Sequence, residues 1–234
     1  MIGILSDAHG NGAVFQKMVE VLFERGATRL IFLGDAVGYI PDISVLDQLL
    51  ALGDTVKCIR GNHEDMLLNG NYPEQLEPIY RIKDTRQNMT KAHTAFIDGW
   101  PSSIVEEYPC GSALFVHGSP HELQNGYVYP DTDLDVFDVP YDFVFMGHTH
   151  RAFKRSHRGT TFVNTGSCGL PRDDGRYASA ALLDPANGNI KLIRLKLASF
   201  PMKEMLAFYG IHASVGGLLA RRLDFVEGEI IETR

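Results

Sequence analysis

Five short stretches of the sequence gather side chains that bind metals or move protons. They read Asp7-Ala8-His9, Gly34-Asp35, Gly61-Asn62-His63-Glu64, His117-Gly118 and Gly147-His148-Thr149-His150. Any one stretch is weak evidence, because a chain with nine histidines produces a His-x-His pair readily by chance. Together they supply imidazole nitrogens with carboxylate and amide oxygens, the mixed ligand set that suits Mn, Fe, Ni, Co or Zn. No cysteine belongs to the set, which disfavours a structural zinc site.

The elements predicted for the first half of the chain must position three of these stretches. Short apolar runs at residues 2–5, 30–33 and 56–59 are typical of buried parallel strands, and each stops at or near one stretch. Apolar residues at helical spacing lie between the runs, within residues 14–22 and 45–50. This alternation predicts right-handed crossovers with helices packed on a sheet. Ligands bind at the carboxyl ends of the strands in such sheets, so we expect the three stretches to meet there.

The second half predicts another sheet with more antiparallel character. Its strands are expected at residues 113–116, 143–146, 160–163, 178–183 and 190–195, and two of them end at the remaining stretches. Asn187-Gly188 predicts a hairpin between the last two strands.

Two segments outside the sheets are predicted to be helical. Residues 69–101 are interpreted as a helical insertion with a helix over about 85–98. Residues 201–222 predict one or two short helices broken at Gly210 and at Gly216-Gly217, within a C-terminal extension over about 201–234. We therefore predict one domain over residues 1–234.

The five stretches also resemble a known family. Ser-Asp-Ala-His-Gly-Asn at 6–11, Gly-Asp at 34–35, Gly-Asn-His-Glu at 61–64, His-Gly-Ser-Pro at 117–120 and Gly-His-Thr-His at 147–150 are similar, in order, to motifs of the calcineurin-like metallophosphoesterase superfamily. The loop at 164–173 is similar to one in its small bacterial and archaeal phosphodiesterase branch. The resemblance covers residues 1–195 and implies a four-layer α/β/β/α sandwich of two mixed sheets flanked by helices.

The resemblance also implies a binuclear site. The first metal ion would be held by Asp7, His9, Asp35 and His150, and the second by Asp35, Asn62, His117 and His148. Asp35 would bridge the ions, because the two oxygens of a carboxylate can bind different metals. His63 corresponds to the catalytic histidine of the family.

That ligand set predicts phosphoester chemistry. Two divalent ions bring four positive charges, and the two aspartates remove only two, so an anionic phosphate is attracted. A bridging hydroxide would attack phosphorus in line, and His63 would protonate the leaving oxygen as general acid. We expect manganese first, with Fe, Ni, Co or Zn as alternatives, and a phosphodiester as substrate.

Several features bear on the substrate. No arginine follows Asp35 closely, which disfavours a protein phosphatase; this activity and a phosphomonoesterase stay as alternatives. Arg172 is a candidate substrate contact, and Arg60 is another unless it is only a solvated residue at a strand end. For Glu64 we favour a charge at a helix N-terminus over a role supporting the site. A non-catalytic scaffold of the same fold is one rival, although no proposed site residue is missing. A nuclease is another, and it would need a local basic groove on this acidic chain.

Composition narrows the choice of partners and of cellular compartment. The chain has 234 residues, a net charge of −7 and 44% hydrophobic residues, which is ordinary globular composition. The acidic balance disfavours nucleic-acid partners, and the absence of a long apolar run disfavours a membrane. Three cysteines without paired spacing and no apparent signal peptide predict the cytoplasm. We expect a small phosphoester or nucleotide-like substrate and leave a homo-oligomer open.

Overall fold

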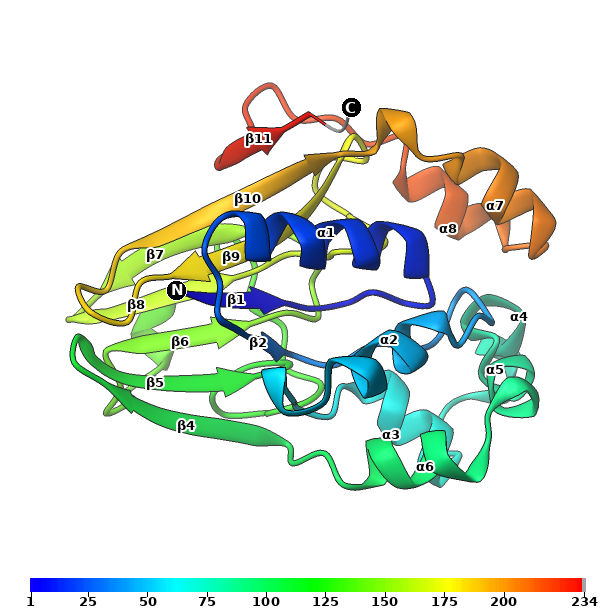
Figure 1. Cartoon of the computed structure of the whole chain (residues 1–234), viewed down its shortest axis with the longest axis horizontal. Coiled ribbons are helices and arrows are strands. Elements are labelled where there is room, and N and C mark those ends of the chain that lie inside the picture. Colours follow the sequence, from blue (N-terminus) through cyan, green and yellow to red (C-terminus); the bar gives the residue numbers. More distant parts are fainter. Residues whose placement is uncertain (233–234) are drawn as a thin grey trace.

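A computed structural model of the chain describes residues 1–232 and contains two mixed sheets (Figure 1). The first has the order β11-β10-β9-β1-β2-β3. Its strands are β1 (Ile2–Leu5), β2 (Arg29–Phe32), β3 (Val56–Cys58), β9 (Tyr177–Leu183), β10 (Ile190–Lys196) and β11 (Glu229–Ile231). β1, β2 and β3 pair in parallel, whereas β9 pairs antiparallel with both β1 and β10.

The second sheet has the order β4-β5-β6-β8-β7. Its strands are β4 (Ser103–Tyr108), β5 (Gly111–Val116), β6 (Phe143–Met146), β7 (Phe153–His157) and β8 (Thr160–Asn164). β5, β6 and β8 are parallel neighbours, and antiparallel strands close both edges. All four residues of β6 are buried, as expected of a central strand covered on both faces.

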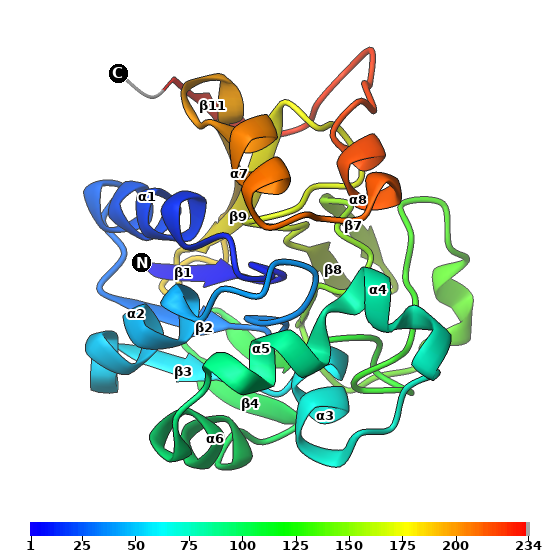
Figure 2. The same ribbon diagram turned by 90° about the vertical axis from the view of Figure 1, so that its right-hand side faces the viewer.

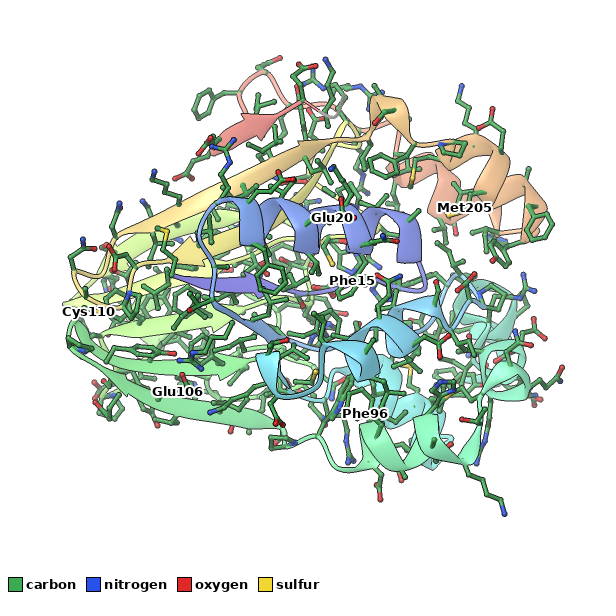
Figure 3. All side chains as sticks on the ribbon, in the orientation of Figure 1. Phe15, Glu20, Phe96, Glu106, Cys110 and Met205 are labelled. Atoms are coloured by element: carbon green, nitrogen blue, oxygen red, sulfur yellow. The ribbon has the colours of Figure 1, made fainter. Side chains whose placement is uncertain are left out.

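Helices cover the outer face of the first sheet. They are α1 (Gly12–Glu24), α2 (Ser44–Leu52), α3 (Asn62–Asn69), α5 (Ile82–Asn88) and α6 (Lys91–Asp98), joined by the short α4 (Glu77–Tyr80). α1 shows why these residues are helical. The Asn11 side chain accepts from the Val14 backbone N–H at the helix start, and Phe15, Met18 and Leu22 face the sheet. Figure 3 shows Phe15 on α1 and Phe96 on α6.

Three apolar layers hold the sandwich together. One lies between the sheets and includes Ile4, Ile31, Phe115 and Phe145. A second lies between the first sheet and its helices. The third covers the outer face of the second sheet, where residues 118–142 form an irregular segment that contains the 3-10 helix Leu134–Val136.

The helical segments differ in detail from the prediction. The helix expected over 85–98 is two helices, because Met89 is extended and the Thr90 side chain caps α6. In the C-terminal segment α7 (Met202–Phe208) and α8 (Ala213–Leu218) are separated at Gly210, as expected. The break expected at Gly216-Gly217 is wrong, since both glycines lie inside α8. No helix within residues 1–232 is long and apolar enough to cross a membrane.

The carboxyl ends of the parallel strands meet on one side of the sandwich (Figure 2). Helices α7 and α8 stand on one flank of this region, and α3, α4 and α5 stand on the other. An apolar cluster connects the flanks: Tyr39, Leu170 and Val215 are buried in it, with Tyr80 and Met205 packed against them. All five polar stretches are therefore delivered to one place.

Candidate metal centre

The turns after the strands hold the candidate ligands in an uncommon backbone conformation. Asp7, His9, Asp35, His148 and His150 all have φ between 49° and 65°, which non-glycine residues rarely adopt. Hydrogen bonds between turns hold them there, including Asp7 N–H to the Gly34 carbonyl and His9 N–H to the Asp35 carbonyl, both 3.0 Å. Such strain gathers at functional sites.

The first group of candidate ligands contains Asp7, His9 and His150, all at most 1% exposed. His9 Nε2 lies 3.0 Å from His150 Nε2, and His150 Nε2 lies 3.2 Å from Asp7 Oδ1. Asp7 and His9 come from the first sheet and His150 from the second. The site therefore spans the sandwich.

The second group contains Asn62, His117 and His148. His117 Nε2 lies 3.0 Å from Asn62 Oδ1 and 3.2 Å from His148 Nδ1. Asn62 begins α3 after the first sheet, whereas the two histidines follow β5 and β6 of the second. His117 is fully buried, and His148 and Asn62 are 7% and 8% exposed.

Asp35 lies between the two groups. Its Oδ2 is 3.6 Å from His9 Nε2 and 3.4 Å from His117 Nε2. Its Oδ1 accepts the backbone N–H of His63 at 2.9 Å. The same oxygen therefore faces both groups, which differs from the expectation that each carboxylate oxygen takes one ion, because the start of α3 occupies the other oxygen.

The spacing of these atoms fits bound metal ions. Two ligand atoms about 2.1 Å from one ion lie about 3.0–3.4 Å apart at right or tetrahedral angles. Four contacts within the groups have this spacing, at 3.0–3.2 Å, and the distance from His9 Nε2 to Asp7 Oδ1 is longer, at 3.8 Å. Asp7 Oδ1 is buried without a hydrogen-bond partner among residues 1–232. A bound cation would give this carboxylate oxygen a partner, and the imidazole nitrogens that face it would be further ligands.

Backbone carbonyls orient three of the imidazoles. Nδ1 of His9, His117 and His150 contacts the carbonyls of Val37, Leu33 and Leu170, at 2.9, 2.7 and 2.6 Å. A hydrogen on each Nδ1 leaves the Nε2 lone pair pointing into the cluster. The ligand set is thus aligned by the fold itself.

Burial and neighbouring charges give most ligands the protonation state that metals require. Burial raises the pKa of Asp7 and Asp35, but nearby His150 and His117 outweigh it and lower both below the ordinary range. Burial lowers the pKa of His148 to about 3. His117 differs, because the Asp35 carboxylate outweighs burial and raises its pKa to about 9. A metal ion would displace that proton on binding.

His63 lies beside the ligands among aromatic rings. Its ring centroid is 4.8 Å from that of His9 and 4.9 Å from those of Tyr39 and Tyr80. Its Nδ1 is buried without a hydrogen-bond partner within the described residues. Burial lowers its pKa to about 4, so the ring is neutral at pH 7.

The two candidate substrate arginines have different surroundings. Arg172 donates from Nη2 to the Tyr39 hydroxyl at 2.6 Å, and its guanidinium lies 5.5 Å from the centre of that ring. Because Tyr39 packs on His9 and His63, Arg172 reaches the edge of the cluster. Arg60 instead donates to the Asp98 carbonyl at 2.6 Å and holds the end of α6. Only Arg172 is directed toward the candidate centre.

Glu64 supports the site, whereas the sequence analysis favoured only a charge at the start of a helix. It is fully buried, and burial raises its pKa to about 7. It does accept the Gly61 N–H at the start of α3, as expected, at 2.9 Å. It also accepts the N–H groups of Asp35 and Ala36, both at 2.7 Å. The available signal was its position in the Gly-Asn-His-Glu stretch.

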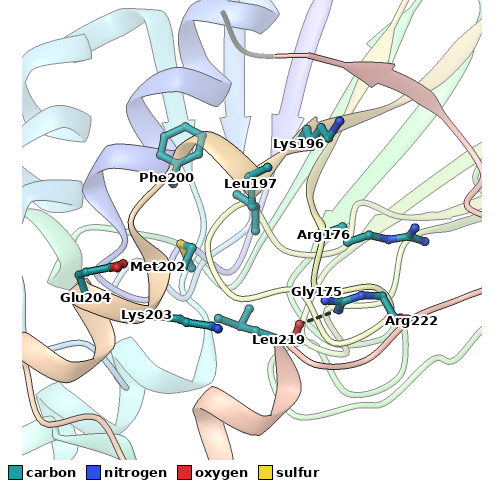
Figure 4. Close-up of a pocket in the computed structure, with 11 residues that line it drawn as sticks. Gly175, Arg176, Lys196, Leu197, Phe200, Met202, Lys203, Glu204, Leu219 and Arg222 are labelled. Atoms are coloured by element: carbon teal, nitrogen blue, oxygen red, sulfur yellow. Dashed lines mark hydrogen bonds between the residues drawn. The ribbon is translucent and has the colours of Figure 1, made fainter.

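A separate cavity of about 420 Å³ lies between the end of β10, the start of α7 and the segment after α8 (Figure 4). Leu197 and Leu219 contribute apolar walls, and Lys203 and Arg222 contribute positive charge. None of the candidate ligands lines it. The chemistry described above therefore belongs to the cluster at the strand ends.

Known proteins share this sequence pattern and fold. An uncharacterized protein from Methanocaldococcus jannaschii is 26% identical over 214 residues, covering 84% of this chain and 87% of that protein. A hypothetical protein from Pyrococcus horikoshii has a solved structure with a TM-score of 0.81 and 19% identity. A metallophosphoesterase from Sphaerobacter thermophilus has a TM-score of 0.74 and 22% identity. Each alignment covers 94% of this chain and 98% of the solved one.

The solved relatives confirm the predicted α/β fold of two mixed sheets flanked by helices. The model of the calcineurin-like phosphoesterase superfamily domain matches residues 1–188, which include every candidate ligand. The predicted resemblance is therefore confirmed: the chain belongs to the calcineurin-like phosphoesterase superfamily and is a metal-dependent phosphoester hydrolase.

Proposed function

We propose that the chain is a binuclear metal-dependent phosphodiesterase. The observation that carries the proposal is the position of Asp35 Oδ2, 3.6 Å from His9 Nε2 and 3.4 Å from His117 Nε2. A carboxylate oxygen between two groups of ligand atoms suits a pair of ions that share it. Paired ions of this kind act on phosphoesters.

The ligand assignment follows the two groups. The first ion is assigned to Asp7, His9, Asp35 and His150, and the second to Asp35, Asn62, His117 and His148. Nitrogen and oxygen donors accept several divalent ions; we propose Mn²⁺ first, with Fe, Ni, Co and Zn as alternatives. When bound, two such ions supply a hydroxide nucleophile near neutral pH and neutralise phosphate oxygens.

The remaining ligands keep the centre attractive to anions. Only Asp7 and Asp35 are carboxylates, and the other five ligands are neutral once His117 has lost its proton. Two divalent ions with two carboxylates leave a net charge of about +2 at the centre. A phosphoester is drawn to this charge although the chain as a whole carries −7.

Two further side chains are assigned to the substrate. His63 is assigned as the general acid: with both ring nitrogens protonated it would give one proton to the leaving oxygen and return to the neutral ring, and the negative charge developing on that oxygen favours the protonated form. Arg172 is assigned to a non-bridging phosphate oxygen, because its Nη2 is at the hydroxyl of Tyr39, whose ring packs on His9 and His63. Arg60 is left out because Asp98 engages it.

We infer a preference for diesters over monoesters from the loop at 164–173, which resembles one in the phosphodiesterase branch of the superfamily. A solved archaeal protein described as a novel phosphodiesterase shares the fold, with a TM-score of 0.51 and 18% identity. One described as a putative diadenosine tetraphosphatase has a TM-score of 0.56 and 18% identity. Both descriptions are compatible with a small phosphodiester as substrate.

The test begins with protein stripped by a chelator and reloaded with Mn²⁺. We expect two ions per chain by elemental analysis and faster turnover of bis-p-nitrophenyl phosphate than of p-nitrophenyl phosphate. His63→Asn should lower kcat by about 10²–10⁴-fold. His121→Asn, at an exposed histidine outside the cluster, is the matched control and should keep wild-type activity.

Three results would contradict the proposal. The first is one ion per chain with full activity. The second is equal activity in His63→Asn and the wild type. The third is no turnover of either ester with Mn²⁺, Ni²⁺, Co²⁺ or Zn²⁺, which would favour the scaffold alternative. A preference for the monoester would refute only the phosphodiesterase assignment.

A further inference from the structure

Two tyrosine rings stand exposed at the side of the candidate centre that faces solvent. Tyr127 is 56% exposed and Tyr129 is 38% exposed, which is unusual for large aromatic side chains. The Tyr127 ring centroid lies 4.3 Å from that of His148, a candidate ligand. The exposed aromatic surface therefore begins in direct contact with the metal cluster.

The cluster opens toward these rings. Among its seven ligands, Asp7, His9, Asp35, His117 and His150 are at most 1% exposed, whereas His148 and Asn62 reach 7% and 8%. The two most exposed ligands mark the side from which a phosphate would reach the cluster. The group esterified to that phosphate then extends outward over His148 and across Tyr127.

The buried residue between the two tyrosines leaves both of their rings on the surface. Residues 127–129 belong to no helix or strand, and their side chains differ in burial. Val128 between them is fully buried in the layer over the second sheet. Anchoring Val128 directs Tyr127 and Tyr129 away from that layer, and their rings are nearly parallel, 14° apart with centroids at 5.9 Å.

Neighbouring contacts fix the outer ring. The Tyr129 N–H donates to the Thr132 hydroxyl at 2.8 Å, and the Thr132 N–H donates to the Tyr129 carbonyl at 3.1 Å. The Arg151 guanidinium lies 5.6 Å from the centre of the Tyr129 ring. These contacts hold the two stacked rings in place, so little ordering is needed when a ligand stacks on one of them.

We propose that Tyr127 and Tyr129 form a stacking site for the nucleobase of a nucleotide substrate. The inference rests on the proposed function, since the phosphate is held at the metal centre. A planar heterocycle is the substituent that such rings bind through their faces. The two tyrosines are binding residues for the base and take no part in bond breaking.

The test compares two ligands that differ only in the base, AMP and ribose 5-phosphate. Binding is measured by calorimetry to Mn²⁺-loaded protein carrying His63→Asn, so that turnover does not interfere. Stacking on an aromatic side chain predicts about tenfold tighter binding of AMP. Tyr127→Ala should bring the ratio of the two affinities close to one. Tyr127→Phe should preserve it, because stacking uses the ring and not the hydroxyl.

Two further variants distinguish the loss of stacking from a disturbance of the candidate ligands. Tyr127→Ala could also disturb His148, so Tyr129→Ala, whose ring has no contact with a candidate ligand among the ring contacts described, should lower the ratio as well. Phe208→Ala removes an 83% exposed ring on α7 and should leave the ratio unchanged. Equal binding of AMP and ribose 5-phosphate by metal-loaded protein would refute the stacking site alone. Failure of both to bind in a metal-dependent way would refute the proposed function.

Discussion

Replacing Glu64 by glutamine tests how the fold holds Asp35, the proposed bridging ligand, in place. Glu64 Oε2 accepts the N–H groups of Asp35 at 2.7 Å and Gly61 at 2.9 Å. Its Oε1 accepts those of Ala36 at 2.7 Å and Val37 at 3.3 Å. Glutamine has nearly the same shape but offers one oxygen and one NH₂ group, so two backbone donors must face another donor.

The magnitude follows from those two donors. Each buried N–H left without an acceptor costs about 1–3 kcal/mol, so Glu64→Gln should lower the free energy of unfolding by about 2–6 kcal/mol. Rotating the amide by half a turn does not help, because each carboxylate oxygen serves two N–H groups. Loosening the turn that carries Asp35 should also weaken metal binding by about 10–100-fold.

Urea unfolding of the chelated protein, followed by circular dichroism, measures the first quantity. Competition with a chromophoric chelator measures the second. Glu20→Gln is the matched control: this exposed glutamate on α1 binds Lys17 at 3.1 Å, and its loss should change stability by no more than about 0.5 kcal/mol. If Glu64→Gln unfolds with the wild-type midpoint and binds metal equally well, Glu64 does not hold the turn.

Three more predictions address the ligands, the substrate and the response to acid. Asp35→Asn should reduce the metal content below two ions per chain by elemental analysis, because its Oδ2 faces both groups; full loading would contradict the bridge. Arg172→Ala should raise KM for the diester about tenfold with a smaller change in kcat, and an unchanged KM would remove it from the substrate site. Burial raises the pKa of Glu106, but hydrogen bonds from Arg29 and Lys57 outweigh it and lower the pKa to about 2. Its stabilisation is therefore complete above the ordinary value of 4.5 and lost as pH falls toward 2. The free energies of unfolding of wild type and Glu106→Gln, about 1 kcal/mol apart at pH 6, should converge in acid; a constant difference would contradict this.

The sequence predicts more of the site when the strand ends are considered together than when each residue is considered alone. A strand end is easy to recognise, and parallel strands bring their carboxyl ends to one edge, so Asp7, Asp35 and Asn62 were expected together. The pairing of the second sheet, which adds His117 and His148, depends on contacts distant in sequence. There the family resemblance, rather than periodicity, indicated which residues meet.

The strands that the sequence analysis did not predict lie at sheet edges. β4, β7 and β11 each form an outer strand, and β7 reads Phe-Lys-Arg-Ser-His with one buried residue. An edge strand with polar side chains lacks the apolar run that marks a central strand. Figure 3 shows Glu106 on β4, a strand without a fully buried residue, which explains the weak signal.

Side-chain partners were the hardest feature to predict. Arg60 and Arg172 both precede or follow candidate stretches, and nothing in the sequence shows that Asp98 engages the first and Tyr39 the second. The same holds for Glu64, whose partners lie on another strand end. Long-range contacts of this kind depend on the whole fold.

The candidate ligands are divided between the two sheets, four on the first and three on the second. Bound ions would therefore connect the two sheets, which also pack on each other through a layer of apolar side chains. Binding to the native state alone adds stability by mass action, about 2.7 kcal/mol at a hundredfold excess over Kd. Metal supply would then govern how long each molecule survives proteolysis as well as how fast it works. Cells grown without the metal should contain less of this protein, even with unchanged synthesis.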